Sequence, residues 1–256
     1  MIPGHADPPR CFVGFFGLNR SLRWTGDSIR RNVIAPLAGA GFELTCVAHF
    51  NRPDFIYSPR AGEHMVPSTM DGVDTMNLRE CWVEPQSEES VADLLPLVLR
   101  MPLQNEEDPH ALIRRNILFQ LHSLRRVGQL LDRCDPRSFR LFVLLRPDLE
   151  YIDPAPVAEI LRLIEAGADL ITPNWHLWGG LNDRFAFCSL KGARAYLGRW
   201  QWVTPFCREK PSIRSETLLR FVAERERLNL DQVAMRARRV RANGVTKDED
   251  FEAGAA

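Results

Sequence analysis

Acidic residues follow an apolar run near the middle of the chain. The run Phe139–Leu145 (FRLFVLL) is almost continuously apolar, which is typical of a strand covered on both faces at the centre of a sheet. Arg146, Asp148 and Glu150 come directly after it, and they point to one side if the extended geometry continues. We predict that Asp148 and Glu150 supply oxygen ligands to Mn²⁺ or Mg²⁺ bridging a diphosphate. A strand end with an Arg–Asp surface pair is the alternative.

A loop rich in Trp, Gly and Asn occupies residues 174–185. Aromatic side chains stack on sugar rings and polar side chains bond sugar hydroxyls, so this loop is predicted to bind a glycan acceptor. The candidate acceptor-binding residues are Asn174, Trp175, His176, Trp178 and Asn182. Asp183 is the candidate general base. The alternative is a structural turn whose tryptophans belong to the core and whose Asp183 pairs with Arg184 or caps a backbone amide.

The first loop has a composition that favours anions. Arg20 and Ser21 precede a predicted helix N-terminus, where free amide groups attract negative charge. The GxGxxG and GxxxxGK[ST] patterns do not occur, which weakens a dinucleotide-binding or P-loop interpretation. His49, His110 and His122 each stand alone in the sequence, so we interpret them as packed or surface histidines rather than metal ligands.

The elements that must position these residues alternate between strand and helix. Apolar runs and helical spacing predict strands at 10–16, 42–50, 139–145, 169–172, 184–189 and 233–241, and helices at 25–37, 89–100 and 110–133, from Asp153 and from Ser215. The connection between the first two strands is long enough to cross over a parallel sheet. We therefore predict one α/β domain over residues 1–256, with an irregular insertion at 51–108 and a loose tail at 245–256.

Composition restricts the partners. The chain of 256 residues is 45% hydrophobic and balances 33 basic against 33 acidic residues, which gives no global reason to expect nucleic acid or an anionic membrane. The longest uncharged stretch, 170–182, is shorter than the ~20 apolar residues of a transmembrane helix. The N-terminus lacks a secretory pattern, and the six cysteines are scattered without a CxxC pair. We therefore expect a cytoplasmic protein with reduced cysteines and no transmembrane segment.

Several stretches together resemble a group of glycosyltransferase-like proteins of bacterial and algal polysaccharide synthesis. In chain order they are FFGLNRSLRWTGDSIRRNVIAPL, FQLHSLRRVGQLL, LLRPDLEYIDP, ITPNWHLWGGLNDRFAFCS and RRVRANG. The resemblance spans most of the chain. It implies a GT-A-like (Rossmann-like) α/β fold, in which a mostly parallel sheet sandwiched by helices binds a nucleotide sugar.

The resemblance also implies roles for individual residues. Arg20 and Ser21 would face the nucleotide, and Arg125 would approach it. Asp148 would take the metal or diphosphate position. Asp183 would face the acceptor. This sequence has Arg-Pro-Asp where many such proteins have Asp-x-Asp, so Arg146 would supply part of the positive charge. The implied activity moves a sugar from a nucleotide diphosphate donor to a glycan or lipid-linked acceptor.

Three other functions compete with this one. A catalytically silent glycan- or nucleotide-binding protein of the same fold would bind without turnover. A nucleic-acid binder would use the basic stretch 236–241, although the neutral total charge argues against it. A nucleotidyltransferase would form the nucleotide sugar, and the missing glycine-rich, lysine-bearing signature weakens that interpretation.

Overall fold

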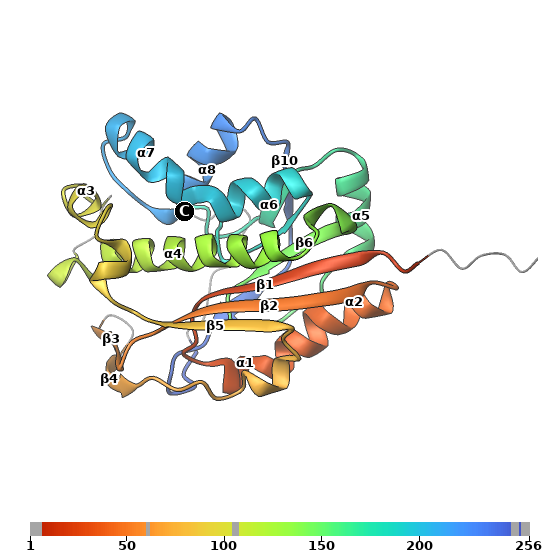
Figure 1. Ribbon diagram of the computed structural model, residues 1–256, viewed down its shortest axis with the longest axis horizontal. Helices are drawn as coiled ribbons and strands as arrows, with labels where there is room; N and C mark the ends of the chain where they lie inside the picture. Colours follow the sequence, from red (N-terminus) through yellow and green to blue (C-terminus); the bar gives the residue numbers. More distant parts are fainter. Residues whose placement is uncertain (1–6, 60–61, 104–107, 247–250, 252–256) are drawn as a thin grey trace, which may run out of the picture.

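The computed structural model describes residues 7–59, 62–103, 108–246 and 251 (Figure 1). Within these residues the main sheet has seven strands in the order β10-β8-β9-β6-β1-β2-β5. Their bounds are β1 (Arg10–Leu18), β2 (Glu43–Arg52), β5 (Glu80–Pro85), β6 (Phe139–Leu145), β8 (Leu170–Pro173), β9 (Phe185–Cys188) and β10 (Leu230–Val233). Strand β9 is antiparallel to both β6 and β8, and the other pairings are parallel.

Helices cover both faces of the sheet (Figure 1). One face carries α1 (Leu22–Ile29), the π-helical turn Arg30–Ile34, α2 (Ala35–Gly39) and α5 (Val157–Glu165). The other carries α3 (Leu95–Leu99), α4 (Leu112–Arg133), α6 (Leu190–Leu197), α7 (Val203–Glu209) and α8 (Ser215–Arg225). Strand β1 separates the two hydrophobic cores, because Val13 and Phe15 face the first and Phe12 and Phe16 the second. The predicted α/β class with a mostly parallel sheet between helices is confirmed.

Two short antiparallel strand pairs and several 3₁₀ turns complete the described fold. Strand β7 (Leu149–Tyr151) pairs with β11 (Ala237–Arg239), and β3 (Phe55–Ser58) pairs with β4 (Glu63–Pro67), each antiparallel. The 3₁₀ turns lie at Asp74–Met76, Glu88–Val91, Pro109–Ala111, Pro136–Ser138 and Gly198–Trp202. No helix of the described part is both long and apolar enough to cross a bilayer. All six cysteines are free thiols, as expected.

The structure departs from the predicted elements in several places. Helices α6 and α7 were not predicted, and the helix predicted at 89–100 is a 3₁₀ turn followed by the short α3. The stretch 51–108 is not wholly irregular, because β5 forms one edge of the main sheet. The side chains of this edge strand are only partly buried, so its sequence lacks the apolar pattern of a central strand. The helix expected at Asp153 begins at Val157, since the carboxylate of Asp153 bonds Arg236 instead of capping a helix. The strand expected at 233–241 is divided into β10 and β11. Most of the predicted tail lies outside the described residues.

Candidate functional site

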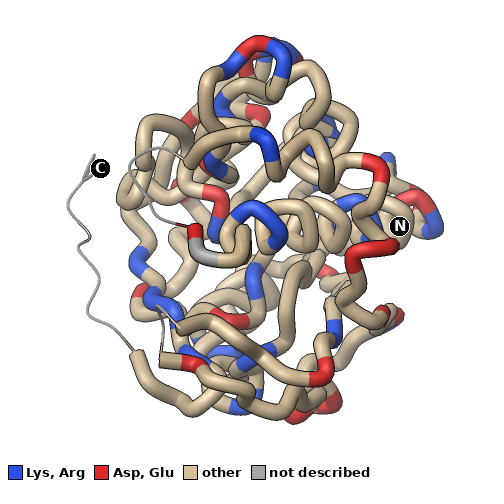
Figure 2. The backbone as a smooth tube through the Cα atoms, turned by 90° about the vertical axis from the view of Figure 1, so that its left-hand side faces the viewer, with Lys and Arg blue, Asp and Glu red and all other residues tan. Residues whose placement is uncertain are grey.

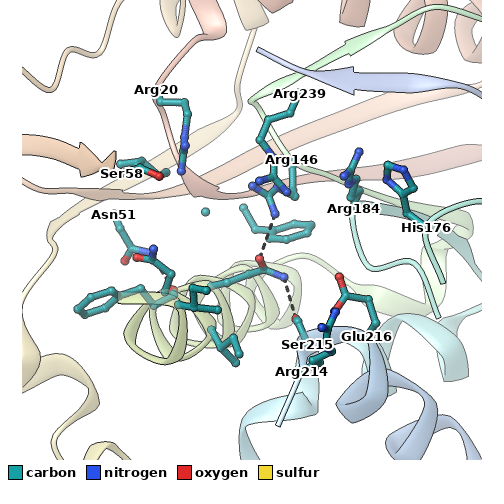
Figure 3. Close-up of a pocket in the computed structure, with 18 of the residues that line it drawn as sticks. Arg20, Asn51, Ser58, Arg146, His176, Arg184, Arg214, Ser215, Glu216 and Arg239 are labelled. Atoms are coloured by element: carbon teal, nitrogen blue, oxygen red, sulfur yellow. Dashed lines mark hydrogen bonds between the residues drawn. The ribbon is translucent and has the colours of Figure 1, made fainter. Parts of the chain in front are cut away.

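A pocket of about 450 Å³ opens where β1, β2 and β6 end (Figure 3). Its described lining combines segments that are distant in sequence, including the loop after β1, helix α4, the loop before β9 and the start of α8. Among the residues that the structure describes, six arginines and a single acid, Glu216, line it; the arginines are Arg20, Arg146, Arg184, Arg214, Arg239 and Arg241. This charge balance favours an anionic ligand.

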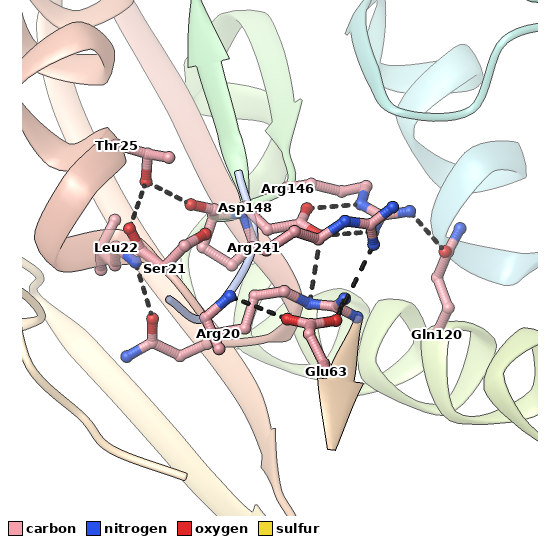
Figure 4. Close-up of polar contacts among 12 residues, drawn as sticks. Arg20, Ser21, Leu22, Thr25, Glu63, Gln120, Arg146, Asp148 and Arg241 are labelled. Carbon is pink, nitrogen blue, oxygen red and sulfur yellow. Dashed lines mark hydrogen bonds and ion pairs between the residues drawn. The ribbon is translucent and has the colours of Figure 1, made fainter. Parts of the chain in front are cut away.

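Two buried acids hold the guanidinium groups on one side of the pocket (Figure 4). Arg146 donates to both carboxylate oxygens of Asp148, over 2.9 and 2.8 Å. Arg20 bonds Glu63 at 3.0 Å and lies 3.5 Å from Asp148, while Arg241 lies 3.9 Å from Glu63. Burial alone would raise the pKa of Asp148, but Arg146 and Arg20 hold it well below its usual value, so this side chain is ionised. Asp148 therefore orients arginines in the pocket.

Further arginines crowd the described part of the pocket wall. Burial, together with Arg146 and Arg184, lowers the pKa of Arg239 to about 9. The pKa of Arg241 is lowered too, by burial and then by Arg20. A lowered pKa means that the charged, protonated form of each arginine is less favourable in this environment than in water. A bound anion would relieve this crowding. In the view of Figure 2, basic and acidic positions are otherwise interspersed along the chain.

The contacts of Asp148 and Glu150 do not fit a shared metal ion. Asp148 is 1% exposed and gives both oxygens to Arg146. Glu150 lies opposite Arg238 in the β7–β11 pair and accepts its Nε at 2.6 Å. Each carboxylate already has a guanidinium partner, as Arg-Pro-Asp in place of Asp-x-Asp suggested. The described contacts thus lend no support to the metal prediction at this pair, and guanidinium groups stand where the ion was expected.

The loop 174–185 divides into residues that face the pocket and residues that build the loop. His176 and Trp178 line the pocket. Trp175 is fully buried and donates to the carbonyl of Met235, and Asn182 is fully buried and donates to the carbonyl of Trp175. Asn174, half-buried, is absent from the described lining. His176 and Trp178 are therefore placed where they can contact an acceptor in the pocket, whereas Trp175 and Asn182 lie in the protein interior.

Gly180 allows this loop to approach helix α8. A Cβ at Gly180 would lie 2.1 Å from the carbonyl oxygen of Glu216, a backbone atom that also accepts the Leu181 amide. We expect Gly180→Ala to lower the free energy of unfolding by about 1–3 kcal/mol, because the loop and the helix must separate. Urea denaturation measures the change. The matched control is Gly39→Ala, where a Cβ meets nothing within 4 Å; equal losses in both variants would contradict the close approach.

Asp183 lies behind the pocket wall. It is 3% exposed, and its Oδ2 accepts hydrogen bonds from Gln120, from Ser215 and, at 3.2 Å, from the fully buried Arg199. Burial raises the pKa of Asp183, but Arg199 and Ser215 outweigh it and hold the pKa below its usual value. A base of this kind accepts protons weakly. Its catalytic role stays a prediction.

Glu216 is the pocket acid that the sequence did not single out. It lies in the first turn of α8 and lines the pocket beside Arg214 and Ser215. Burial, and then the charge of Asp183, raises the pKa of Glu216 to about 7. A carboxyl group of that pKa exchanges protons readily near neutral pH. In the sequence it is one polar residue among several in an amphipathic helix, so its only signal is its place in the first turn.

Two residues implied by the resemblance lie away from the described lining. Arg125 is exposed on α4, with its guanidinium 5.6 Å from the Trp200 ring centroid. Ser21 is buried directly before α1, where its carbonyl accepts the Thr25 amide. Arg20 and Arg146 do line the pocket, and Asp148 bonds Arg146 there. The nucleotide roles of all five residues stay predictions.

The chain matches no protein-family model, and no curated protein matches it. Solved structures with some similarity to it include three transferases. Mouse xyloside xylosyltransferase 1 is 12% identical, with 88% of this chain and 85% of that one covered and a TM-score of 0.43. A Desulfovibrio desulfuricans protein described as a nucleotide-diphospho-sugar transferase is 13% identical, with 88% of this chain and 79% of that one covered and a TM-score of 0.37. A glycosyltransferase involved in glycosylation of the PBCV-1 major capsid is 10% identical, with 88% of this chain and 82% of that one covered and a TM-score of 0.41. Such likeness leaves the chemistry to this chain's own residues.

Proposed function

We propose that this protein is a nucleotide-sugar-dependent glycosyltransferase of the GT-A-like type, acting on a glycan or lipid-linked acceptor. The observation that carries the proposal is the pocket at the strand ends. The described part of its wall holds six arginines and one acid, Glu216, of pKa about 7. The arginines suit a diphosphate, which carries several negative charges and bonds guanidinium groups bidentately. Glu216 suits an acceptor hydroxyl, which must lose a proton when it is glycosylated.

The proposed reaction is a displacement at the anomeric carbon of the donor sugar. The acceptor oxygen forms the new glycosidic bond while the bond from that carbon to the diphosphate breaks. The bonding electrons leave with the diphosphate, whose growing charge is stabilised by Arg146, Arg239 and their neighbours. The acceptor proton passes to Glu216, or to Asp183 if that residue is the base. His176 and Trp178 would position the acceptor ring.

One observation favours the silent binding protein as the second candidate. Asp148 and Glu150 are both paired with arginines, so the motif predicted to hold a catalytic cation is already in use. A silent protein would bind the nucleotide in the same arginine-rich pocket but would release no sugar. Measuring nucleotide release from a bound nucleotide sugar separates the two functions.

Nucleotide binding is the first test. We expect UDP, GDP or CMP, with or without Mn²⁺, to raise the thermal midpoint, since a ligand at 100 times its Kd adds about 2.7 kcal/mol of stability. Arg239→Gln should weaken that binding by about 1.5–3 kcal/mol, the range for hydrogen bonds to charged groups. Isothermal titration at two salt concentrations measures both effects.

The matched control for Arg239 is Arg140→Gln. Arg140 is an exposed arginine on β6 whose partner is Glu165. The Arg140→Gln substitution should therefore leave nucleotide affinity unchanged. If no nucleotide shifts the midpoint of the unmodified protein under any of these conditions, the donor site is not where we propose it.

A further inference from the structure

Three side chains of metal-ligand type meet between β2, β5 and α4, apart from the described pocket lining. Glu84 Oε2 lies 3.2 Å from His49 Nε2 and 3.0 Å from His122 Nε2. All three ligand atoms lie within 4.8 Å of one another, and the two imidazole rings are 5.6 Å apart. The expectation that these histidines stand alone is therefore wrong, because the sheet and the helix bring them together.

Hydrogen bonds from Ser123 fix the orientation of His49. The Ser123 hydroxyl donates to the His49 carbonyl over 2.9 Å and accepts the Gly17 amide over 2.7 Å. Its oxygen also lies 2.8 Å from His49 Nδ1. With the hydroxyl proton directed to the carbonyl, Nδ1 must carry the proton of that bond, which leaves a lone pair on Nε2. His49 Nε2 is buried, makes no hydrogen bond within the described structure and faces the Glu84 carboxylate.

We propose that His49, Glu84 and His122 bind a divalent transition-metal cation of the Zn²⁺ type. Two imidazole nitrogens and one carboxylate oxygen are a ligand set that Zn²⁺ takes at metal–ligand distances of about 2.0–2.2 Å, and tetrahedral bonds of that length place ligand atoms about 3.3 Å apart. The two distances to Glu84 are close to that value. The Nδ1 bond to Ser123 is the kind of outer contact that orients a metal-binding histidine.

The other atoms around the three ligands set limits on the ion. Arg126 donates to Oε1 of Glu84, which turns Oε2 toward the histidines, while its charge weakens the attraction for a cation. The side chains of His49, His122 and Glu84 are 0%, 12% and 29% exposed. Solvent thus reaches the site from the Glu84 side, where a water molecule can complete the coordination.

The site would connect three elements beside the pocket. Asn51 and Gln86, each two residues further along the chain than His49 and Glu84, line the pocket. A bound cation would join the edge strand β5 to β2 and to α4, and would therefore stiffen one pocket wall. This inference does not depend on the proposed transferase activity, since it needs no nucleotide.

Cobalt titration of the full chain without nucleotide tests the site. Tetrahedral Co²⁺ absorbs in the visible, so Co²⁺ should produce an absorption band that saturates at one equivalent and disappears when Zn²⁺ is added. His122→Ala and Glu84→Gln should weaken Co²⁺ binding by more than about tenfold, because even loss of an outer partner costs 10–100-fold. The control is His64→Ala, which replaces an exposed histidine on β4. This variant should bind Co²⁺ as tightly as the unmodified protein does.

Each outcome decides the proposal. A saturable band lost in His122→Ala but kept in His64→Ala supports it. Absence of a band in the unmodified protein overturns it, as does a band that persists in His122→Ala, since other side chains would then be the ligands. The thermal midpoint of each variant without metal shows that it folds. If Glu84→Gln does not fold, the partly exposed His122 variant still decides the outcome.

Discussion

Glu216→Gln should lower kcat for sugar transfer by about 10²–10⁴-fold and leave nucleotide affinity almost unchanged, because an amide cannot accept the acceptor proton. The carboxyl group must be ionised to act as a base, and the pKa of Glu216 is raised to about 7. Activity of the unmodified protein should therefore rise with pH up to about 7 and level off above it. Nucleotide release, measured over pH 5–9 with the nucleotide sugar selected by the binding test, gives the profile.

The control for Glu216 lies on the same helix. Glu224 is exposed in α8, so Glu224→Gln should retain both the rate and the pH profile. If Glu216→Gln keeps near-normal activity, the base is another residue. Asp183 becomes the better candidate if the profile of the unmodified protein is flat over pH 5–9, because the lowered pKa of Asp183 keeps it ionised throughout that range. If the unmodified protein binds a nucleotide sugar but never releases its nucleotide, the silent binding function is correct.

Asp183→Asn should lower the free energy of unfolding by about 3–5 kcal/mol, because the change leaves Arg199 as an uncompensated buried charge. The pKa of Asp183 is lowered in the folded protein. Its stabilising contribution is thus complete above the ordinary pKa of 3.8 and is lost as the pH falls through the lower folded value. Urea denaturation of both proteins at neutral pH and near pH 3 measures the difference, which should shrink at the acidic pH.

Two further variants separate charge pairing from catalysis at Asp183. Asp132 and Arg194 form an exposed pair, so Asp132→Asn should change stability little. Arg199→Met combined with Asp183→Asn should recover part of the loss, because it removes the unpaired charge. Near-normal stability of Asp183→Asn together with loss of transfer would contradict the structural role and favour the catalytic one.

The elements with the strongest patterns were predictable. Strands β1 and β6 are buried on both faces and read as apolar runs, and α4 repeats its apolar residues at helical spacing. Strand β5 was not predicted, since an edge strand that carries Glu80, Trp82 and Glu84 looks like an irregular segment. Secondary structure was predictable where burial enforced a pattern.

The pocket was predictable only in part. Its arginines on the first loop and after β6 follow from the rule that ligands bind at the carboxyl ends of parallel strands. Arg239 reaches the same pocket because β11 crosses back to β7, which no local pattern reveals. Trp175 and Trp178 have the same residue type, and only the folded loop sends one into the core and the other to the pocket. Long-range pairing decided what local composition could not.

The pocket is completed by segments that are far apart in the sequence. Glu63 accepts the backbone amide of Ala242, 179 residues away, and Arg23 donates to the carbonyl of Ala242, 219 residues away. Contacts of such sequence separation form slowly, because closing a long loop costs entropy before the contacts stabilise the fold. During synthesis on the ribosome the pocket therefore stays incomplete until β11 has emerged and paired. A ligand that needs Arg239 therefore cannot stabilise a chain in which β11 has not yet paired with β7.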